Sequence, residues 1–393
     1  MRRLRGTSGM RTADKSLRIL HVVSAFSSDG KSGGPVRVAL TQAEELRKRG
    51  HDVVVVGGVF GASPASVFPG VRLFRGRTIP GLGFAGAFSL PLLMWALFHL
   101  REFDRVHVHL SRDLVTIPVA LVARRKRLII QTHGMIDAST RWLAAVIDSL
   151  AVRPLLRSAR TVVALSAREE HDLREVCEDV SRLSILPNSL AIPEEWRRPL
   201  RTPREVVFLA RMHERKRPEL FVEMAIRLLT DGYRASFHLV GPDEGAIAGP
   251  MRRVASAGLS KSITWEGAIE STEVLSRLAG AYLYVLTAER EPFGLTLLEA
   301  MAVGTPVVLS SDAALAKDVE LAEAGTSFDG GVNDLHRRVA DYLDDPSKRD
   351  KHALNARNLV VTRFSSRGLG AALERIYFEG SAVDDLEANP GRA

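Results

Sequence analysis

The sequence predicts an α/β protein made of two Rossmann-like domains that face a central cleft. Its 393 residues exceed the usual size of one domain, and 46% of them are hydrophobic, which is enough for two cores. Short β-branched runs alternate with helical patterns, as in parallel sheets built from βαβ units. Three prolines and a cluster of charges interrupt the alternation at residues 193–204, which we interpret as a linker.

The first predicted domain spans residues 18–192. Its strands are expected at LRILHVVSA, HDVVVVGGV, DRVHVHL, KRLIIQTH and TVVALS, and its first helix at VRVALTQAEELRKRG. Residues 1–17 are basic, but the apolar stretch after them is too short for a signal peptide, so we expect a disordered tail.

The second predicted domain spans residues 205–363, with strands at VVFLA, SFHLVG, SITWEGAI, AYLYVLTA and TPVVLSS. Residues 364–380 have the spacing of an amphipathic helix, and 381–393 predict a disordered tail. Open parallel sheets bind ligands at the carboxyl ends of their strands, so loops at those ends are the first places to search for a site.

Composition excludes several classes of function. The single cysteine, Cys177, rules out a disulfide framework and fits a reducing, cytoplasmic compartment. The net charge of +8 is compatible with nucleic acid, an anionic membrane or an arginine-rich exterior. Aromatic residues are only 6% and do not alternate with the basic ones, so we predict no nucleic-acid partner.

A membrane partner stays open at one segment, FSLPLLMWALFHL at residues 88–100. The run is too short to span a bilayer and is interrupted by Pro91 and His99. It predicts either a core helix or a peripheral contact with the anionic inner face of a membrane. The basic neighbours that allow the second interpretation are Arg72, Arg75, Arg77, Arg101 and Arg105.

Two glutamates eight positions apart stand out in EREPFGLTLLEA. Glu291 falls in a strand-to-helix loop and Glu299 inside the helix, about 12 Å further along if the helix were continuous. That separation suits two acids that bind different hydroxyls of one elongated ligand, such as a sugar nucleotide. The helix start at Phe293, Gly294 and Leu295 offers free backbone N–H groups beside it. An ordinary ion pair is the alternative.

A pair of cations occupies the matching loop at the start of the second domain. In ARMHERKRPEL, Arg211 follows a predicted strand and Lys216 precedes a helix that begins with Pro218. Two cations beside a helix N-terminus can bind a diphosphate, with the arginine as a fork and the lysine as a point charge. A solvated basic turn is the alternative, because Arg215 and Arg217 lie there too.

Taken together, these stretches resemble the Glu-x7-Glu and Arg-x4-Lys motifs of retaining glycosyltransferases of group 1 (family 4), which have the GT-B fold. The resemblance implies that Glu291 contacts the donor sugar, Glu299 the ribose, and Arg211 and Lys216 the diphosphate. It also implies a C-terminal helix that crosses back to the first domain.

The resemblance extends into the first domain. Gly33 and Gly34 match a Gly-Gly loop that approaches the ligands, and His133 matches a histidine that reaches the donor sugar near the reacting centre. Without the resemblance, a lone histidine is more often structural. Asp137 and Asn188 are candidate acceptor contacts.

The metal prediction is negative. His107 and His109 have the spacing of a metal pair on a strand, but no cysteine or further histidine is near them in the sequence. No Asp-x-Asp motif stands at a strand end, so we expect no cofactor and no required metal.

The predicted function is transfer of a hexose from a nucleoside diphosphate sugar to a hydroxyl of a saccharide or lipid-linked saccharide, with retention of configuration. Two alternatives share the fold. One is a nucleotide-sugar 2-epimerase. The other is a non-catalytic scaffold in glycan assembly, which three departures from the family pattern keep open: Ala210, Arg217 and Ser189 stand where glycines are usual.

Overall fold

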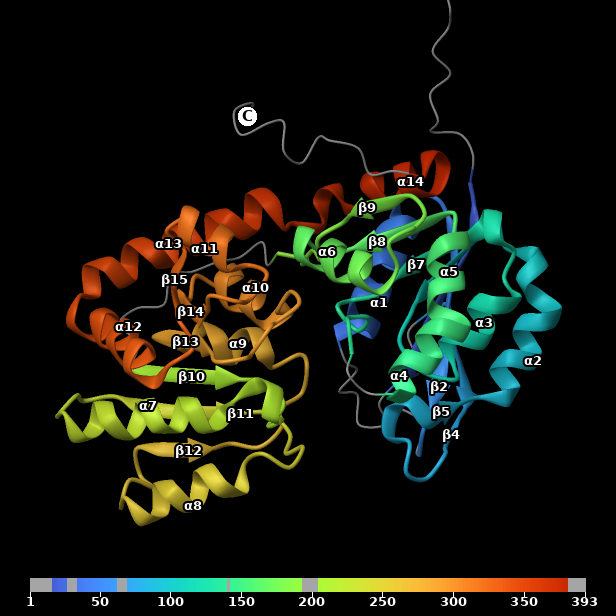
Figure 1. Ribbon diagram of the computed structural model, residues 1–393. Coiled ribbons are helices and arrows are strands. Elements are labelled where there is room, and N and C mark those ends of the chain that lie inside the picture. Colours follow the sequence, from blue (N-terminus) through green and yellow to red (C-terminus); the bar gives the residue numbers. More distant parts are fainter. Residues whose placement is uncertain (1–15, 27–33, 62–68, 140–141, 193–203, 381–393) are drawn as a thin grey trace, which may run out of the picture.

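The computed structural model describes residues 16–26, 34–61, 69–139, 142–192 and 204–380 (Figure 1). Gly33, nearly all of the predicted linker and both predicted tails, except Ser16 and Leu17, lie outside these ranges. The described chain forms two α/β domains, each built on a parallel sheet, so the predicted fold class is confirmed.

The first domain contains a seven-stranded parallel sheet in the order β3-β2-β1-β6-β7-β8-β9. The strands are β1 (Arg18–Phe26), β2 (Asp52–Val59), β3 (Val71–Arg75), β6 (Arg105–His109), β7 (Leu128–Gln131), β8 (Thr161–Ala164) and β9 (Leu183–Ile185). Most positions of the central strands are buried because helices cover both faces, as is usual in all-parallel sheets.

Helix α1 (Gly34–Lys48) packs on one face of this sheet. The other face is covered by α2 (Leu90–His99), α3 (Thr116–Val122), α6 (Ala167–Val176) and a continuous helix formed by α4 (Trp142–Ile147), the π-helical η5 (Asp148–Val152) and α5 (Arg153–Ser158). Short elements connect them: β4 (Arg77–Thr78), η2 (Gly83–Gly86), β5 (Ala87–Phe88), η3 (Leu100–Glu102) and η4 (Arg125–Arg127).

The second domain contains a six-stranded parallel sheet in the order β12-β11-β10-β13-β14-β15. The strands are β10 (Glu205–Leu209), β11 (Ser236–Val240), β12 (Ile263–Trp265), β13 (Leu283–Leu286), β14 (Val307–Ser310) and β15 (Gly325–Phe328). One face is covered by α7 (Pro218–Thr230), α8 (Ala248–Ser256) and α12 (Val332–Asp344). The other is covered by α9 (Val274–Ala279), α10 (Leu295–Ala302), α11 (Ala316–Leu321) and α13 (Pro346–Arg363).

The C-terminal helix crosses back to the first domain, as predicted. After η7 (Ser366–Gly368), helix α14 (Leu369–Glu379) packs beside α1, and Glu374 binds Arg49 at 2.6 Å and His51 at 3.0 Å. The helix begins later than the predicted residue 364. Phe364 belongs to the core of the second domain, where its ring contacts Phe293.

One expectation is wrong in detail. Leu17, assigned to the tail, is buried, and its N–H donates to His51 Nδ1 at 3.1 Å.

The run at 88–100 contains α2, which has a core side and a surface side. Leu92 and Ala96 belong to the core of the first domain, and Trp95 packs against it. On the other side of the helix, large side chains such as Phe98, with 73% exposure, lie at the surface.

Candidate active site

A cleft of about 530 Å³ lies between the two domains, at the carboxyl ends of both sheets. Residues from both domains line it. The first domain contributes Gly34, Pro35, Arg37, His133, Gly134, Met135, Leu165 and Asn188, and the second contributes, among others, Arg211, Lys216, Glu291, Phe293, Gly294, Leu295 and Thr296.

Glu291 and Lys216 form an ion pair in this cleft. Glu291 is buried in the loop after β13, and its carbonyl accepts from the Ala314 N–H at 3.0 Å. Its Oε2 binds Lys216 Nζ. The Thr287 hydroxyl at the end of β13 fixes the lysine loop, because it donates to the Lys216 and Arg217 carbonyls at 2.8 Å. The predicted acid and cation therefore meet in one place.

Glu299 lies behind the cleft wall on α10, with only 1% of its surface exposed. Its Oε1 binds Arg37, which projects from α1 of the first domain. Its Oε2 is buried and has no hydrogen-bond partner among the described residues. A buried carboxylate oxygen without a donor is costly, so this atom is a candidate to receive a ligand hydroxyl.

Arg37 was not predicted from the sequence. It lines the cleft and joins the domains through Glu299, yet it is an unremarkable arginine in the first turn of α1. No local pattern distinguishes it, because its partner comes from the other domain.

The helix start next to Glu291 has the predicted geometry. Gly294 is the N-cap of α10 with φ 77°, a left-handed conformation in which an added Cβ would lie 2.7 Å from Leu297 Cδ1. The N–H groups of Leu295 and Thr296 precede the first intrahelical bond of α10 and have no acceptor within the helix. They lie along the cleft beside Lys216.

Arg211 lines the same cleft but has a partner already. Its Nη1 binds both carboxylate oxygens of Glu244 at 3.0 Å, and its side chain is 63% exposed. A diphosphate would therefore compete with Glu244 for this guanidinium. Arg217, which stands where the family usually has glycine, keeps the expected backbone turn. Arg217 adopts φ 51°, so it takes the left-handed turn that makes glycine common at this position.

His133 and Gly134 form a turn that places the first domain against the second. His133 has φ 53° and Gly134 φ 68°. Buried Glu169 on α6 holds the turn, because it accepts from the Thr132 hydroxyl at 2.6 Å and from the Gly134 N–H. Burial raises the pKa of Glu169. Sequence reasoning gave this residue no role, although Ser166 and Glu169 have the spacing of a helix-capping box.

Gly134 is expected to tolerate no side chain. A Cβ at this position would lie 2.2 Å from Pro292 Cβ across the domain interface, and the left-handed φ adds strain. Gly134→Ala should therefore push the domains apart and lower the activity of this cleft more than tenfold, with little change in the melting temperature of either domain. Activity assays and small-angle scattering would check this, with Gly232→Ala, which has φ 93° but open space around it, as the control for backbone strain. Wild-type activity in Gly134→Ala would contradict the tight interface.

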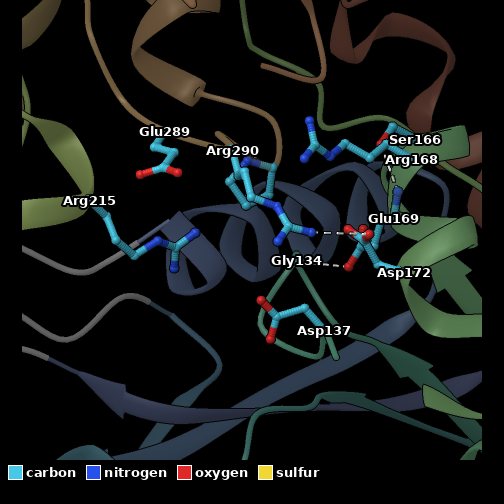
Figure 2. A pocket seen from close by; sticks show the side chains of 10 residues that line it. Gly134, Asp137, Ser166, Arg168, Glu169, Asp172, Arg215, Glu289 and Arg290 are labelled. Atoms are coloured by element: carbon cyan, nitrogen blue, oxygen red, sulfur yellow. Dashed lines mark hydrogen bonds and ion pairs between the residues drawn. The ribbon is translucent and has the colours of Figure 1, made fainter. Parts of the chain in front are cut away.

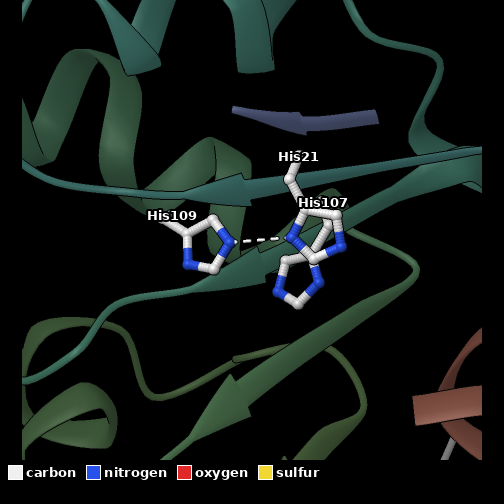
Figure 3. Close-up of side chains that lie close together, drawn as sticks. All are labelled: His21, His107 and His109. Atoms are coloured by element: carbon white, nitrogen blue, oxygen red, sulfur yellow. Dashed lines mark hydrogen bonds between the residues drawn. The ribbon is translucent and has the colours of Figure 1, made fainter. Parts of the chain in front are cut away.

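Behind His133, three more histidines and a tyrosine form a buried hydrogen-bonded chain. Figure 3 shows three of its members, His21, His107 and His109. His133 Nε2 lies 2.6 Å from His109 Nδ1, and His109 Nε2 lies 3.0 Å from His21 Nδ1. Tyr377 of α14 bonds to both His21 Nε2 at 3.1 Å and His107 Nδ1 at 2.8 Å. The chain connects the cleft wall to the C-terminal helix.

When every histidine ring is neutral, the hydrogen bonds of this histidine chain can run in either of two directions. If Tyr377 donates to His21, each ring donates to the next, and His133 keeps its proton on Nδ1. If all bonds reverse, His133 Nδ1 is left as an acceptor. Burial lowers the pKa of His21 and His133 to about 3 and those of His107 and His109 well below their usual range, so the rings are neutral at pH 7.

The fold brings a third histidine to the pair on β6. No histidine is near His107 and His109 in the sequence, but His21 of β1 lies beside them, with ligand atoms within 4.8 Å of one another. His21 and His109 share a hydrogen bond at 3.0 Å. A metal ion would need that proton removed and both lone pairs turned toward a common centre.

A second, smaller cavity of about 180 Å³ adjoins the cleft and shares Gly134, Arg215 and Pro292 with it (Figure 2). Its wall is strongly charged. Arg290 reaches from the second domain toward Asp172 of the first at 3.6 Å. The predicted acceptor residue Asp137 lies in this cavity, where its Oδ1 binds Arg112 at 3.3 Å.

The remaining predicted residues are divided between the cleft and the undescribed ranges. Asn188 lines the main cleft, is buried, and has an Oδ1 with no hydrogen-bond partner among the described residues. Gly34 begins α1, and a Cβ there would lie 3.6 Å from Leu295 Cδ1. Gly33 falls outside the described residues.

Two facing Rossmann-like domains with an acid, a lysine and a helix N-terminus in the cleft between them define a GT-B protein. Comparison with family models agrees. Residues 32–191 match the model described as Glycosyltransferase Family 4, and residues 193–359 match Glycosyl transferases group 1. The chain belongs to the group 1 glycosyltransferases with the GT-B fold.

Individual relatives are distant, and some of them span nearly the whole chain. One is the GDP-mannose:cellobiosyl-diphosphopolyprenol alpha-mannosyltransferase of Komagataeibacter xylinus, 24% identical over 93% of both chains. A second is the lipopolysaccharide core biosynthesis mannosyltransferase LpcC of Rhizobium leguminosarum bv. viciae, 32% identical over 42% of this chain and 48% of the relative. The crystal structure of Anabaena Alr3699/HepE in complex with UDP and glucose superposes with a TM-score of 0.73, at 18% identity, over 91% of this chain and 98% of that one.

Proposed function

We propose that this glycosyltransferase moves a hexose from a UDP- or GDP-sugar to a hydroxyl of a saccharide or lipid-linked saccharide, with retention of configuration, in the synthesis of a cell-surface polysaccharide or glycolipid. The observation that carries the proposal is the meeting of Glu291, Lys216 and the free amides of α10 in one interdomain cleft. The names of the mannosyltransferase relatives and the UDP complex of a structural neighbour support the donor class.

The donor would lie with its diphosphate between the two domains. Lys216, Arg211 and the amides at the start of α10 would balance the negative charge that grows on the phosphate oxygens as the bond to the sugar breaks. Glu291 would accept from hydroxyls of the sugar, and His133 would contact the sugar from the opposite wall. Glu299 Oε2, which has no partner among the described residues, would accept from the ribose.

We infer a front-face transfer without an enzyme nucleophile. The bond between the anomeric carbon and the phosphate oxygen breaks, the acceptor oxygen bonds to that carbon on the same face, and its proton moves to the leaving phosphate. The two acids of the motif support this inference because each already binds a cation, Glu291 with Lys216 and Glu299 with Arg37, which favours a binding role for both. NMR should show the same anomeric configuration in donor and product.

No metal is assigned to the reaction, because Lys216, Arg211 and the helix amides supply the positive charge that a metal would bring. Full activity in EDTA would support this, and recovery only on addition of Mg²⁺ or Mn²⁺ would overturn it.

The acceptor would enter through the smaller cavity, where Asp137 faces the space shared with the cleft, and Asn188 would contact it from the main cleft. A cytoplasmic location fits the single buried cysteine, Cys177.

Thermal shift with UDP-, GDP-, ADP- and dTDP-sugars tests the donor site. A nucleotide at a hundred times its dissociation constant should add about 2.7 kcal/mol to the free energy of unfolding. We expect one base to stabilise the wild type and to have no such effect on Glu299→Ala. If no nucleotide binds, the protein is a scaffold of the same fold; conversion of one free nucleotide sugar into its 2-epimer would instead indicate an epimerase.

A further inference from the structure

Exposed hydrophobic side chains are concentrated in one segment of the first domain, and nine of them lie on three of its helices. Of the 18 large hydrophobic side chains that are exposed in the described residues, 13 lie between Ile79 and Leu150. Helices α2, α3 and the continuous α4–η5–α5 helix lie in one layer, because their inner sides share a single core against the same face of the sheet (Figure 1). We call the outward side of this layer the outer helical surface.

Two helices of this surface show an apolar stripe turned to solvent. On the α4–η5–α5 helix the stripe consists of Trp142, Val146 and Leu150, which follow each other at intervals of four residues; Trp142 and Leu150 are each 76% exposed. On α2 it includes Leu90, Met94, Leu97 and Phe98. A soluble monomer rarely exposes so many large side chains together without a partner that covers them.

The charge around the stripes is mainly positive, although Glu175, Glu178 and Asp179, at and after the end of α6, are exposed acids. Arg124, Arg125 and Lys126 are exposed directly after Leu121 and Val122, the exposed end of α3. Other exposed cations in the described residues 69–160 are Arg72, Arg75, Arg77, Arg101, Arg153 and Arg157.

The exposed acids of the same segment are few. Glu102 and Asp104 are the only ones in the described part of residues 69–160; Glu102 binds the Arg18 guanidinium at 2.8 Å, and Asp104 accepts from the Arg18 backbone N–H at 2.9 Å. Asp179, beyond this segment, binds Arg157 at 3.6 Å. The other cations named above have no ion pair with a carboxylate among the described residues.

We propose that the outer helical surface docks on an anionic lipid bilayer. Within the described ranges no helix has the length and apolarity to cross a membrane, so the contact is peripheral, with Trp142, Leu150 and Phe98 inserted at the level of the headgroups. The cations then lie against anionic headgroups. A second copy of this chain is a poorer partner, because a twofold contact would set the basic surface against itself.

Docking would also place the active site at the membrane. Trp142 follows Asp137 of the smaller cavity by only five positions, so the acceptor side of the cleft lies next to the inserted helix. This last step rests on the proposed function; the bilayer contact itself does not.

Flotation of the purified full-length protein with vesicles tests the contact, without donor or acceptor. Vesicles of two parts phosphatidylcholine to one part phosphatidylglycerol should bind the wild type, and pure phosphatidylcholine should bind it far less. Trp142→Ser with Leu150→Ser should lower binding at least tenfold, because each residue loses its apolar insertion. Arg124→Gln and Arg125→Gln should each lower it about fivefold, and high salt should have a similar effect.

Two exposed leucines of the second domain provide a matched control. Leu321 and Leu354 of the second domain are 74% and 53% exposed, and Leu321→Ser with Leu354→Ser should leave vesicle binding unchanged. All variants alter exposed side chains, so unchanged melting temperatures are expected.

Three outcomes would overturn the proposal: no binding of the wild type to anionic vesicles, equal loss in both double variants, or a wild-type dimer that Trp142→Ser dissociates. Nucleotide-sugar binding measured on the same samples separates this result from the proposed function.

Discussion

Replacing Lys216 by alanine is expected to lower kcat about 100- to 1,000-fold, because under the proposed function the leaving diphosphate would lose one of its two cations. Lys216 is held by Thr287 and by the ion pair with Glu291, so the ammonium is positioned before the substrate arrives. Preorganised charge of this kind acts mainly on the transition state, where the phosphate oxygens become more negative. The effect should therefore appear in kcat more than in KM, measured as release of the nucleoside diphosphate.

Two further variants sharpen this test. Lys216→Arg keeps the charge and should recover part of the rate. Lys261→Ala removes an exposed lysine of the same domain and should change nothing. A folded Lys216→Ala enzyme with wild-type kcat would show that the ion pair with Glu291 is only structural.

The order of the main elements could be predicted because the buried strands and amphipathic helices have strong patterns. β2 is an unbroken valine-rich run, and α7 shows helical spacing after Pro218. The sequence did not predict the short edge strands β3, β9 and β15, since segments of three to five residues are too short to show a distinctive period.

The residues of the candidate site could be predicted where the pattern that identifies each of them lies within its own loop. Glu291, Gly294 and Lys216 follow strands of the second domain, and each lines the cleft as expected. Contacts that depend on the docking of two domains were not predictable. Arg37 reaches Glu299 only because α1 faces α10, and no local signal marks it.

The buried histidines show a third limit of prediction from the sequence. His21 interrupts an apolar strand in the sequence and has no visible partner there. In the fold, β1 and β6 are neighbours, and His21 pairs in register with His107. Strand order depends on tertiary packing, so the histidine chain could be recognised only from the structure.

That chain should make the protein sensitive to acid. Burial lowers the pKa of His21 and His133 to about 3, whereas unfolding returns both to about 6.5. Between these values the unfolded state binds more protons than the folded state, so stability is full above about pH 6.5 and falls as the pH falls. The two residues together should cost about 2.7 kcal/mol per pH unit in this window.

Other groups alter this slope in known directions. His107 and His109 act in the same direction, because burial also lowers their pKa. Glu169 acts in the opposite direction over its own window, since its raised pKa means that the folded state holds that proton more tightly. The single proton bound by Glu169 does not offset the protons taken up by four histidines on unfolding. A loss of several kcal/mol is comparable with the whole stability of an ordinary domain, so the first domain should lose much of its stability between pH 6.5 and 5.

Urea unfolding at half-unit steps from pH 7.5 to 5.0 measures the slope, with His107→Phe and His171→Gln as paired variants. His107→Phe removes one buried titrating ring and should reduce the slope by about 1.4 kcal/mol per pH unit. His171 is 74% exposed at its side chain and should leave the slope unchanged when replaced. A wild-type slope near zero between pH 5 and 6.5 would mean that the histidines take up protons in the folded state, and that the hydrogen-bonded chain behind His133 is broken before the domain unfolds.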